Sequence, residues 1–288
     1  GVFTTISAGN SGSNNYTIGS PGCARKVITI GASDNNDNIA SFSSRGPNLL
    51  TYGIKPDITA PGVSVYSSMP NNQYSYKSGT SMSCPHVAGA AALLLELDPD
   101  LEPEEIKAAF IHSAEDISAN LWEQGAGRLD VYNATFVESA FIPQSISFGV
   151  VDLTVDVWTK PDTVMLRNLG DEDKTYVLSV EGTLPDSLTF SIEPDTVDIN
   201  AGDETQIVIT ARCVNDDVPN PDGTIPTYEA KLVAASDYDE IKSPIAVIKS
   251  PMIDFSFDAS VYFLLVHNND DIYNFIFNPG TEYQMLLP

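Results

Sequence analysis

The sequence predicts an α/β segment followed by an all-β segment, and three observations lead to this fold class. Two short buried strand patterns, at 2–8 and 26–32, precede two helical patterns, at 80–97 and from 102 onward. Beyond about residue 136, period-2 apolar runs separated by turn clusters replace the helical patterns. Strands followed by helices favour an α/β layer structure, and 288 residues suffice for two or more domains.

The first part contains three predicted strands and two predicted helices. The strands cover 2–8, 26–32 and 63–67, and a loop rich in Gly, Ser and Asn joins the first two. Residues 80–97 are rich in Ala, Leu and Val, which favours a helix buried on most faces that ends at Asp98-Pro99-Asp100. The second helix opens at Glu102-Pro103, with Ile106, Ala109 and Phe110 on its apolar face.

The second part reads as a β-sandwich over 140–250. Period-2 runs lie at 175–180, 205–210 and 228–233, and turn clusters lie at 168–171, 200–203 and 220–223. A tail over 251–288 shows three strand patterns with turns at 267–271 and 278–280. The tail is too small to be stable alone, so we expect it either to pack on the sandwich or to begin a further domain. The predicted domains are therefore 1–139, 140–250 and 251–288.

The charge of the chain excludes some partners. Its net charge is −25; residues 1–135 carry 13 acidic and 7 basic residues, and the remainder carries 26 and 7. Such an acidic surface repels nucleic acids and anionic lipids. The longest apolar run, 88–95, is too short for a membrane span. The chain opens on a buried-looking strand without a charged leader, so we expect the protein to begin upstream.

The cysteines do not indicate a metal site or a disulfide framework. Cys23, Cys84 and Cys213 lie far apart, and small buried side chains are their simplest interpretation. A Cys23–Cys84 bridge stays open only if the protein reaches an oxidising compartment.

The most informative stretch is Gly79-Thr80-Ser81-Met82-Ser83-Cys84-Pro85-His86-Val87-Ala88-Gly89. It places Ser81 at the first turn of a helix, where unpaired backbone N–H groups and the helix dipole favour developing negative charge. This position suits a nucleophile for acyl transfer. A second element, Ala8-Gly9-Asn10-Ser11-Gly12, sets an amide side chain at the end of a strand, where its N–H can donate to an oxyanion.

Together these motifs resemble the subtilase family of serine proteases. The segments 40–47, 55–62 and 125–131 also resemble the family, and the likeness covers about residues 1–135. It implies the C-terminal half of a subtilisin-like parallel-sheet domain, acting on proteins or peptides without a required cofactor. Structural calcium stays open but has no assigned residues. The likeness also implies that a fibronectin-III-like sandwich follows, and it suggests an extracellular or cell-surface location with an upstream signal.

The resemblance assigns roles to particular residues. Ser81 would form the acyl-enzyme, and Asn10 would donate to the oxyanion beside the Ser81 N–H. The substrate-binding positions would be Ala8, Gly9, Gly19, Thr80 and Met82. The turn Gly19-Ser20-Pro21-Gly22 resembles the wall of a side-chain pocket, in which the Ser20–Pro21 bond is expected to be cis.

The general base is missing from this pattern. His86 lies five residues after Ser81 on the same helix, about 140° around it, so its ring cannot reach the serine oxygen. His112 near a helix end and His267 in a predicted turn have no motif support, and Asp57 is interpreted as a structural loop residue. In the family the catalytic Asp and His precede the matching region. We therefore expect a fragment that is inactive alone and whose partner is the missing N-terminal half.

Three alternatives compete with a serine protease. The Ser81 context lacks the second glycine of the nucleophile elbow of an α/β-hydrolase esterase. A thiol protease built on Cys84 and His86 fails because residues two apart on a helix face different directions. A degenerate, non-catalytic subtilase that serves as a secreted or surface binding module is the more serious alternative, although retention of both Ser81 and Asn10 counts against it.

Overall fold

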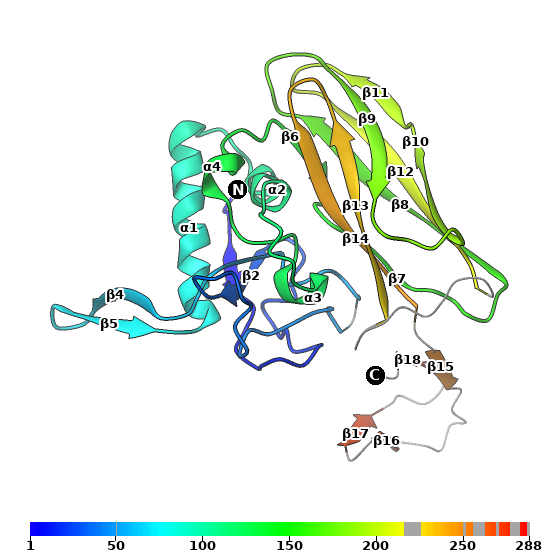
Figure 1. The fold of residues 1–288 in the computed structure, drawn as a ribbon, viewed down its shortest axis with the longest axis horizontal. Helices are drawn as coiled ribbons and strands as arrows, with labels where there is room; N and C mark the ends of the chain where they lie inside the picture. Colours follow the sequence, from blue (N-terminus) through cyan, green and yellow to red (C-terminus); the bar gives the residue numbers. More distant parts are fainter. Residues whose placement is uncertain are drawn as a thin grey trace.

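The computed structural model describes residues 1–49, 51–215 and 226–249, together with the backbone of four short strands beyond residue 251. Figure 1 shows a helix-bearing part on the left and two larger sheets on the right. The structure is mixed α/β, with parallel and antiparallel sheets, as predicted. No helix in the described ranges is both long enough and apolar enough to span a membrane.

A small parallel sheet forms the centre of the helix-bearing part. Its order is β1 (Thr5–Ser7), β2 (Ile28–Ser33), β3 (Ile58–Pro61), and every residue of β2 is buried. Helix α1 (Thr80–Leu97) packs against all three strands, and the parallel pairing starts with Thr5 opposite Ile28. A strand covered on its faces carries a continuous apolar run, which is why β2 was recognisable from the sequence.

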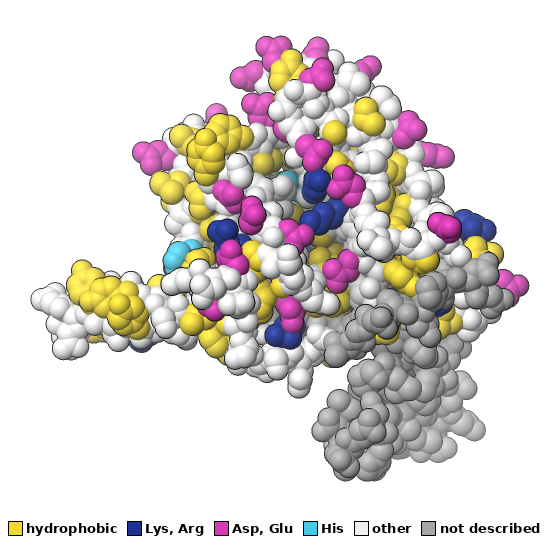
Figure 2. Space-filling model, in the orientation of Figure 1, with side chains coloured by type: hydrophobic (Ala, Val, Ile, Leu, Met, Phe, Trp, Pro, Cys, Tyr) yellow, Lys and Arg dark blue, Asp and Glu magenta, His cyan; other side chains and the backbone are white. Residues whose placement is uncertain are grey.

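The third predicted strand, 63–67, is present over residues 65–67 but lies outside the parallel sheet. The third strand of the sheet is β3, while β4 (Val65–Met69) pairs with β5 (Gln73–Lys77) in a separate hairpin. Asn71 and Asn72 both have positive φ at the tip, a conformation that favours a tight hairpin over a return to the sheet. The hairpin projects from the molecule, and Figure 2 shows a hydrophobic patch on it where Tyr66, Tyr74 and Tyr76 are exposed.

Both long helices lie where the sequence predicts them. The first, α1, covers the predicted 80–97. Helix α2 (Pro103–His112) opens with proline and a capping box in which Glu102 and Glu105 bond to each other's backbone N–H groups. Two short helices follow, α3 (Leu121–Gln124) and α4 (Val131–Ala134), capped by the side chains of Asn120 and Asp130.

Two sheets occupy most of the second part. One has the order β10–β12–β8–β6 and the other β11–β9–β13–β14–β7; every pairing is antiparallel except β14 with β7. Buried residues of both sheets form one hydrophobic cluster, to which Leu166 and Ile207 of one sheet and Tyr176 and Leu232 of the other belong. The strands are β6 (Ser139–Ile142), β7 (Ile146–Val150), β8 (Val157–Asn168), β9 (Lys174–Glu181), β10 (Leu188–Glu193), β11 (Thr196–Ile199), β12 (Glu204–Val214), β13 (Thr227–Ala235) and β14 (Glu240–Ile248).

Among its described residues, the tail contains four short strands, where three were predicted. β15 (Met252–Phe255) pairs with β18 (Tyr283–Leu286), and β16 (Phe263–Asn268) pairs with β17 (Asp271–Ile276). His267 was predicted in a turn, but it lies in β16 opposite Ile272, because the antiparallel ladder continues to Asn268. The predicted turns at 220–223 and 278–280 fall outside the described residues. The three predicted domain boundaries stay predictions.

The two parts contact each other through α2 and α3. Helix α2 packs on β6 and β14, and the Trp122 indole N–H of α3 donates to Thr227 Oγ1 at 3.1 Å. His112, at the end of α2, is buried against the sheets: its Nδ1–H donates to Lys242 O at 3.0 Å, and its Nε2 accepts from Phe141 N at 3.1 Å. The neutral imidazole thus joins α2 to β14 and β6.

His112 makes stability depend on pH. Burial lowers its pKa to about 4, and a protonated ring could not accept from Phe141. Because an unfolded histidine titrates near 6.5, the unfolded chain gains the proton first, and stability falls as pH drops from about 6.5 to 4 by up to about 3 kcal/mol. Urea unfolding of the wild type and His112→Gln at several pH values isolates this contribution from that of the carboxylates. Equal slopes between pH 6.5 and 5 in both proteins would contradict it.

Candidate active site

Ser81 is the exposed second residue of α1. Gly79 precedes the helix as its N-cap with φ 154°, Thr80 is fully buried, and Met82 N donates to Gly79 O at 2.9 Å. The side chain of Ser81 is therefore exposed to solvent, and the first turn of α1, which carries it, is fixed by the buried Thr80 and by this hydrogen bond. The positive end of the α1 dipole lies at this position.

Asn10 reaches this helix start from the end of β1. Its Oδ1 accepts from Thr80 N at 2.9 Å and from Thr80 Oγ1 at 3.1 Å, and Thr80 Oγ1 accepts from Gly9 N at 3.2 Å. Gly9 has φ 107°, a conformation that favours glycine and lets the chain turn sharply at the strand end. These bonds orient the amide so that its oxygen faces Thr80 and its Nδ2 donor is directed elsewhere.

The Asn10 amide group and the Ser81 nitrogen border the same point, the Cβ position that Gly79 leaves open. A Cβ added at Gly79 would lie 3.5 Å from Asn10 Nδ2, 3.7 Å from Asn10 Oδ1 and 3.8 Å from Ser81 N. Two N–H donors around a single point beside a serine form the arrangement needed to hold the oxygen of a substrate carbonyl as it gains negative charge. The sequence motif indicated both donors but gave no sign that the missing side chain of Gly79 creates the space between them.

No histidine in the described part of the chain contacts Ser81. His86 Nδ1–H donates to Met82 O at 2.8 Å within the same helix. His112 is engaged with Lys242 and Phe141. The backbone of His267 lies in β16, and its side chain is outside the described part. The exclusion of His86 and His112 as the base is thus in agreement with their hydrogen bonds.

The remaining predicted substrate-binding residues lie at the end of β1, in the turn after Ile18 and in the first turn of α1. Ala8 is buried, and its N–H donates to Ile30 O, whereas Gly9 O accepts from Ser44 N at 3.0 Å. Gly19 is exposed and opens a turn in which its carbonyl accepts from Cys23 N at 3.1 Å. Met82, half-buried, follows Ser81 directly. The Ser20–Pro21 bond is cis, as expected.

All three cysteines are free. Cys84 Sγ donates to Thr5 Oγ1 at 3.2 Å, so it is paired with β1 and not with His86. Within the described ranges no three His, Cys, Asp or Glu side chains gather as metal ligands. That the chemistry needs no cofactor stays a prediction.

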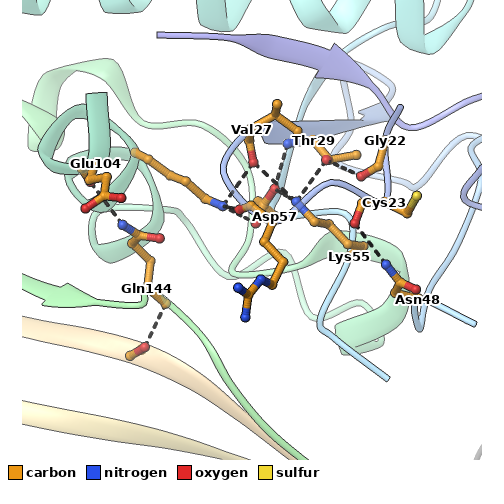
Figure 3. A network of polar contacts seen from close by, with 12 residues as sticks. Gly22, Cys23, Val27, Thr29, Asn48, Lys55, Asp57, Glu104 and Gln144 are labelled. Carbon is orange, nitrogen blue, oxygen red and sulfur yellow. Dashed lines mark hydrogen bonds and ion pairs between the residues drawn. The ribbon is translucent and has the colours of Figure 1, made fainter. Parts of the chain in front are cut away.

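Asp57 lies in a buried polar network below β2 (Figure 3). Its carboxylate forms ion pairs with Lys55 and with Lys107 (3.0 Å), and it accepts from Thr29 N at 2.6 Å. Burial lowers the pKa of Lys55, and the Asp57 carboxylate opposes that shift. The sequence indicated a structural role for Asp57 but missed both lysines. The only available signal for Lys107 was its place among the apolar residues of α2.

Comparison with known proteins matches this segment to a family. Residues 1–129 fit the model of the subtilase family. This segment is therefore similar to the subtilases. The chain is 42% identical to serine protease AprX of Bacillus subtilis (strain 168) over 159 residues, which is 46% of this chain and 35% of that protein.

Two further relatives have similar coverage. Subtilisin DY of Bacillus licheniformis is 42% identical over 133 residues, 46% of either chain. The minor extracellular protease Vpr of Bacillus subtilis (strain 168) is 37% identical over 154 residues, 49% of this chain and 19% of that protein. The chain thus spans less than half the length of each of these subtilases.

Proposed function

We propose that the subtilase segment carries the nucleophile half of a serine endopeptidase site. Ser81 would attack the carbonyl of a peptide bond and form an acyl-enzyme, while Asn10 Nδ2 and Ser81 N hold the oxyanion. The observation that supports this proposal is that Asn10 Nδ2 and Ser81 N lie 3.5 Å and 3.8 Å from the Cβ position that Gly79 leaves open. The substrates are proteins or peptides, and the expected location is extracellular or the cell surface.

The base and the acid that orients it come from a further polypeptide segment. Two open surfaces support this. Helix α1 exposes apolar residues, with Leu93 54% and Leu97 69% accessible, and among the described strands β1 pairs only with β2. A helix that is apolar on all sides is normally covered. We propose that the further segment, which carries the base and the acid, packs on the exposed face of α1 and beside β1. We also propose that the two sheets that follow α4 form a fibronectin-III-like sandwich that braces the protease.

Hydrolysis of a peptide substrate tests the proposal. The 288-residue chain alone should be inactive. Co-refolding with a polypeptide that carries the Asp and His segments of a related subtilase should restore cleavage, and Ser81→Ala should abolish it. Restored folding without cleavage would instead favour the alternative of a degenerate binding module. No specific ligand site that would support a binding module is evident in the described sheets.

A glycine substitution tests the oxyanion geometry. Gly79→Ala places a methyl group 3.5 Å from Asn10 Nδ2 and strains a residue at φ 154°, so kcat of the completed protease should fall about 100-fold or more. Gly12→Ala is the matched control, because Gly12 lies in the Asn10 loop at φ 94° with no atom within 4 Å of an added Cβ. Equal effects of the two substitutions would show that backbone strain, and not the filled space, causes the loss.

A further inference from the structure

The loop that leads into β2 has little regular structure of its own. Residues 19–27 contain only turns and bends between the Asn10 loop and β2, which begins at Ile28. Gly19, at its start, is one of the substrate-binding residues proposed from the resemblance to subtilases. A loop of this kind keeps its shape only if its backbone polar groups find partners, because neither a helix nor a sheet supplies them.

Buried side chains supply those partners. Four carbonyl groups of this loop accept hydrogen bonds from groups beneath it (Figure 3): Gly22 O from Thr29 Oγ1 (2.6 Å), Cys23 O from Asn48 Nδ2 (2.9 Å), Arg25 O from Lys107 Nζ (3.1 Å), and Val27 O from both lysines, Lys107 (3.0 Å) and Lys55 (3.3 Å). Three different segments, β2, the loop before β3 and α2, therefore hold one loop.

The charges explain why two lysines are placed here. Lys55, Asp57 and Lys107 are each at most 6% accessible, and together they carry one surplus positive charge. The partial negative charges of the loop carbonyls compensate that surplus, while Asp57 keeps both ammonium groups in place. Neutral partners at these positions could satisfy fewer carbonyls, since an ammonium group offers three donors.

We propose that the buried cluster of Lys55, Asp57 and Lys107 is a positioning device that fixes the loop 19–27 and with it the wall of the substrate side-chain pocket. The inference that the cluster shapes a substrate pocket rests on the proposed function. The inference that the cluster fixes the loop 19–27 is independent of that function. Lys107 is a positioning residue, because it acts on the substrate only through the carbonyls of Arg25 and Val27.

The three free cysteines allow a direct test in the 288-residue chain. Cys23 lies in the loop, half-buried Cys84 lies in α1, and buried Cys213 lies in β12. Lys107→Met should raise the rate at which iodoacetamide labels Cys23 about tenfold and leave Cys84 and Cys213 unchanged, because Cys23 alone of the three lies in the loop whose carbonyls lose Lys107. Lys107→Arg should restore slow labelling. Arg167→Met is the matched control, since it removes a different ion pair of α2, the one with Glu105.

Each outcome of the labelling experiment decides the proposal. Unchanged labelling of Cys23 in Lys107→Met overturns it, and so does an equal rise at all three cysteines, which reports global unfolding. If Lys107→Met fails to fold, Lys55→Met is read in the same way, since it leaves Lys107 and Asp57 as a neutral pair. In the completed protease, Lys107→Met should raise KM about tenfold with little change in kcat. Failure of peptide cleavage alongside the expected Cys23 labelling would overturn the protease proposal alone.

Discussion

Replacing Asn10 by alanine should lower kcat of the completed protease about 10²–10³-fold, because one of two donors to the oxyanion is removed. This magnitude comes from the loss of such a donor in a related protease and not from this chain. KM should change little, since the donor acts mainly on the charge that develops in the transition state. Steady-state kinetics with a peptide substrate measures both parameters.

Asn10 also links the loop after β1 to the start of α1, so its structural role must be separated from its role as an oxyanion donor. Its Oδ1 accepts from the N–H and the hydroxyl of Thr80, and alanine loses these bonds as well. Asn10→Asp keeps an acceptor for Thr80 but replaces the Nδ2 donor by a second oxygen. It should therefore lower kcat as much as Asn10→Ala while preserving the thermal stability that alanine reduces. Wild-type kcat in Asn10→Asp would refute the oxyanion role.

Replacing Asp57 should cause the largest loss of stability. Asp57→Asn leaves Lys55 and Lys107 buried without a counter-charge, and breaking a buried ion pair in this way costs about 3–5 kcal/mol. Urea unfolding followed by the fluorescence of Trp122 and Trp158, one in each part of the chain, measures the loss. Glu181→Gln is a suitable control, because its ion pair with Lys242 is exposed and should contribute no more than about 1 kcal/mol.

A double-mutant cycle identifies the cause of that loss. If repulsion between two unpaired lysines is responsible, Lys55→Met should cost less free energy of unfolding in the Asp57→Asn background than in the wild type. Additive costs would mean that repulsion between the two lysines is not the cause of the loss.

Sequence patterns predicted the elements whose periodicity arises from local burial. The strand at Ile28 and the helix at Thr80 were recognisable from apolar runs, and the helix at Pro103 from its first proline and its acidic first turn. The β3 strand was missed because Ile58–Pro61 has only four residues and ends in proline, whereas the alternation after Val63 is that of an exposed hairpin.

Long-range contacts explain what the sequence could not predict. The motifs indicated Ser81 and Asn10, but Thr80 is the residue that holds Asn10 in place across 70 positions of the chain. Likewise, Lys107 lies 82 positions from the loop carbonyl that it reaches at Arg25. A charged residue on the buried face of a helix signals such a partner without identifying it.

Labelling with a fluorophosphonate probe tests the central claim, which is that this chain carries the nucleophile and the oxyanion donors but not the base. The probe should acylate Ser81 slowly or not at all in the 288-residue chain, and rapidly once a polypeptide bearing a subtilase Asp and His is co-refolded with it. Mass spectrometry should locate the label on Ser81 alone. Rapid labelling of Ser81 in the chain by itself, at the rate of an intact serine protease, would contradict the account, because a base would then lie within these residues.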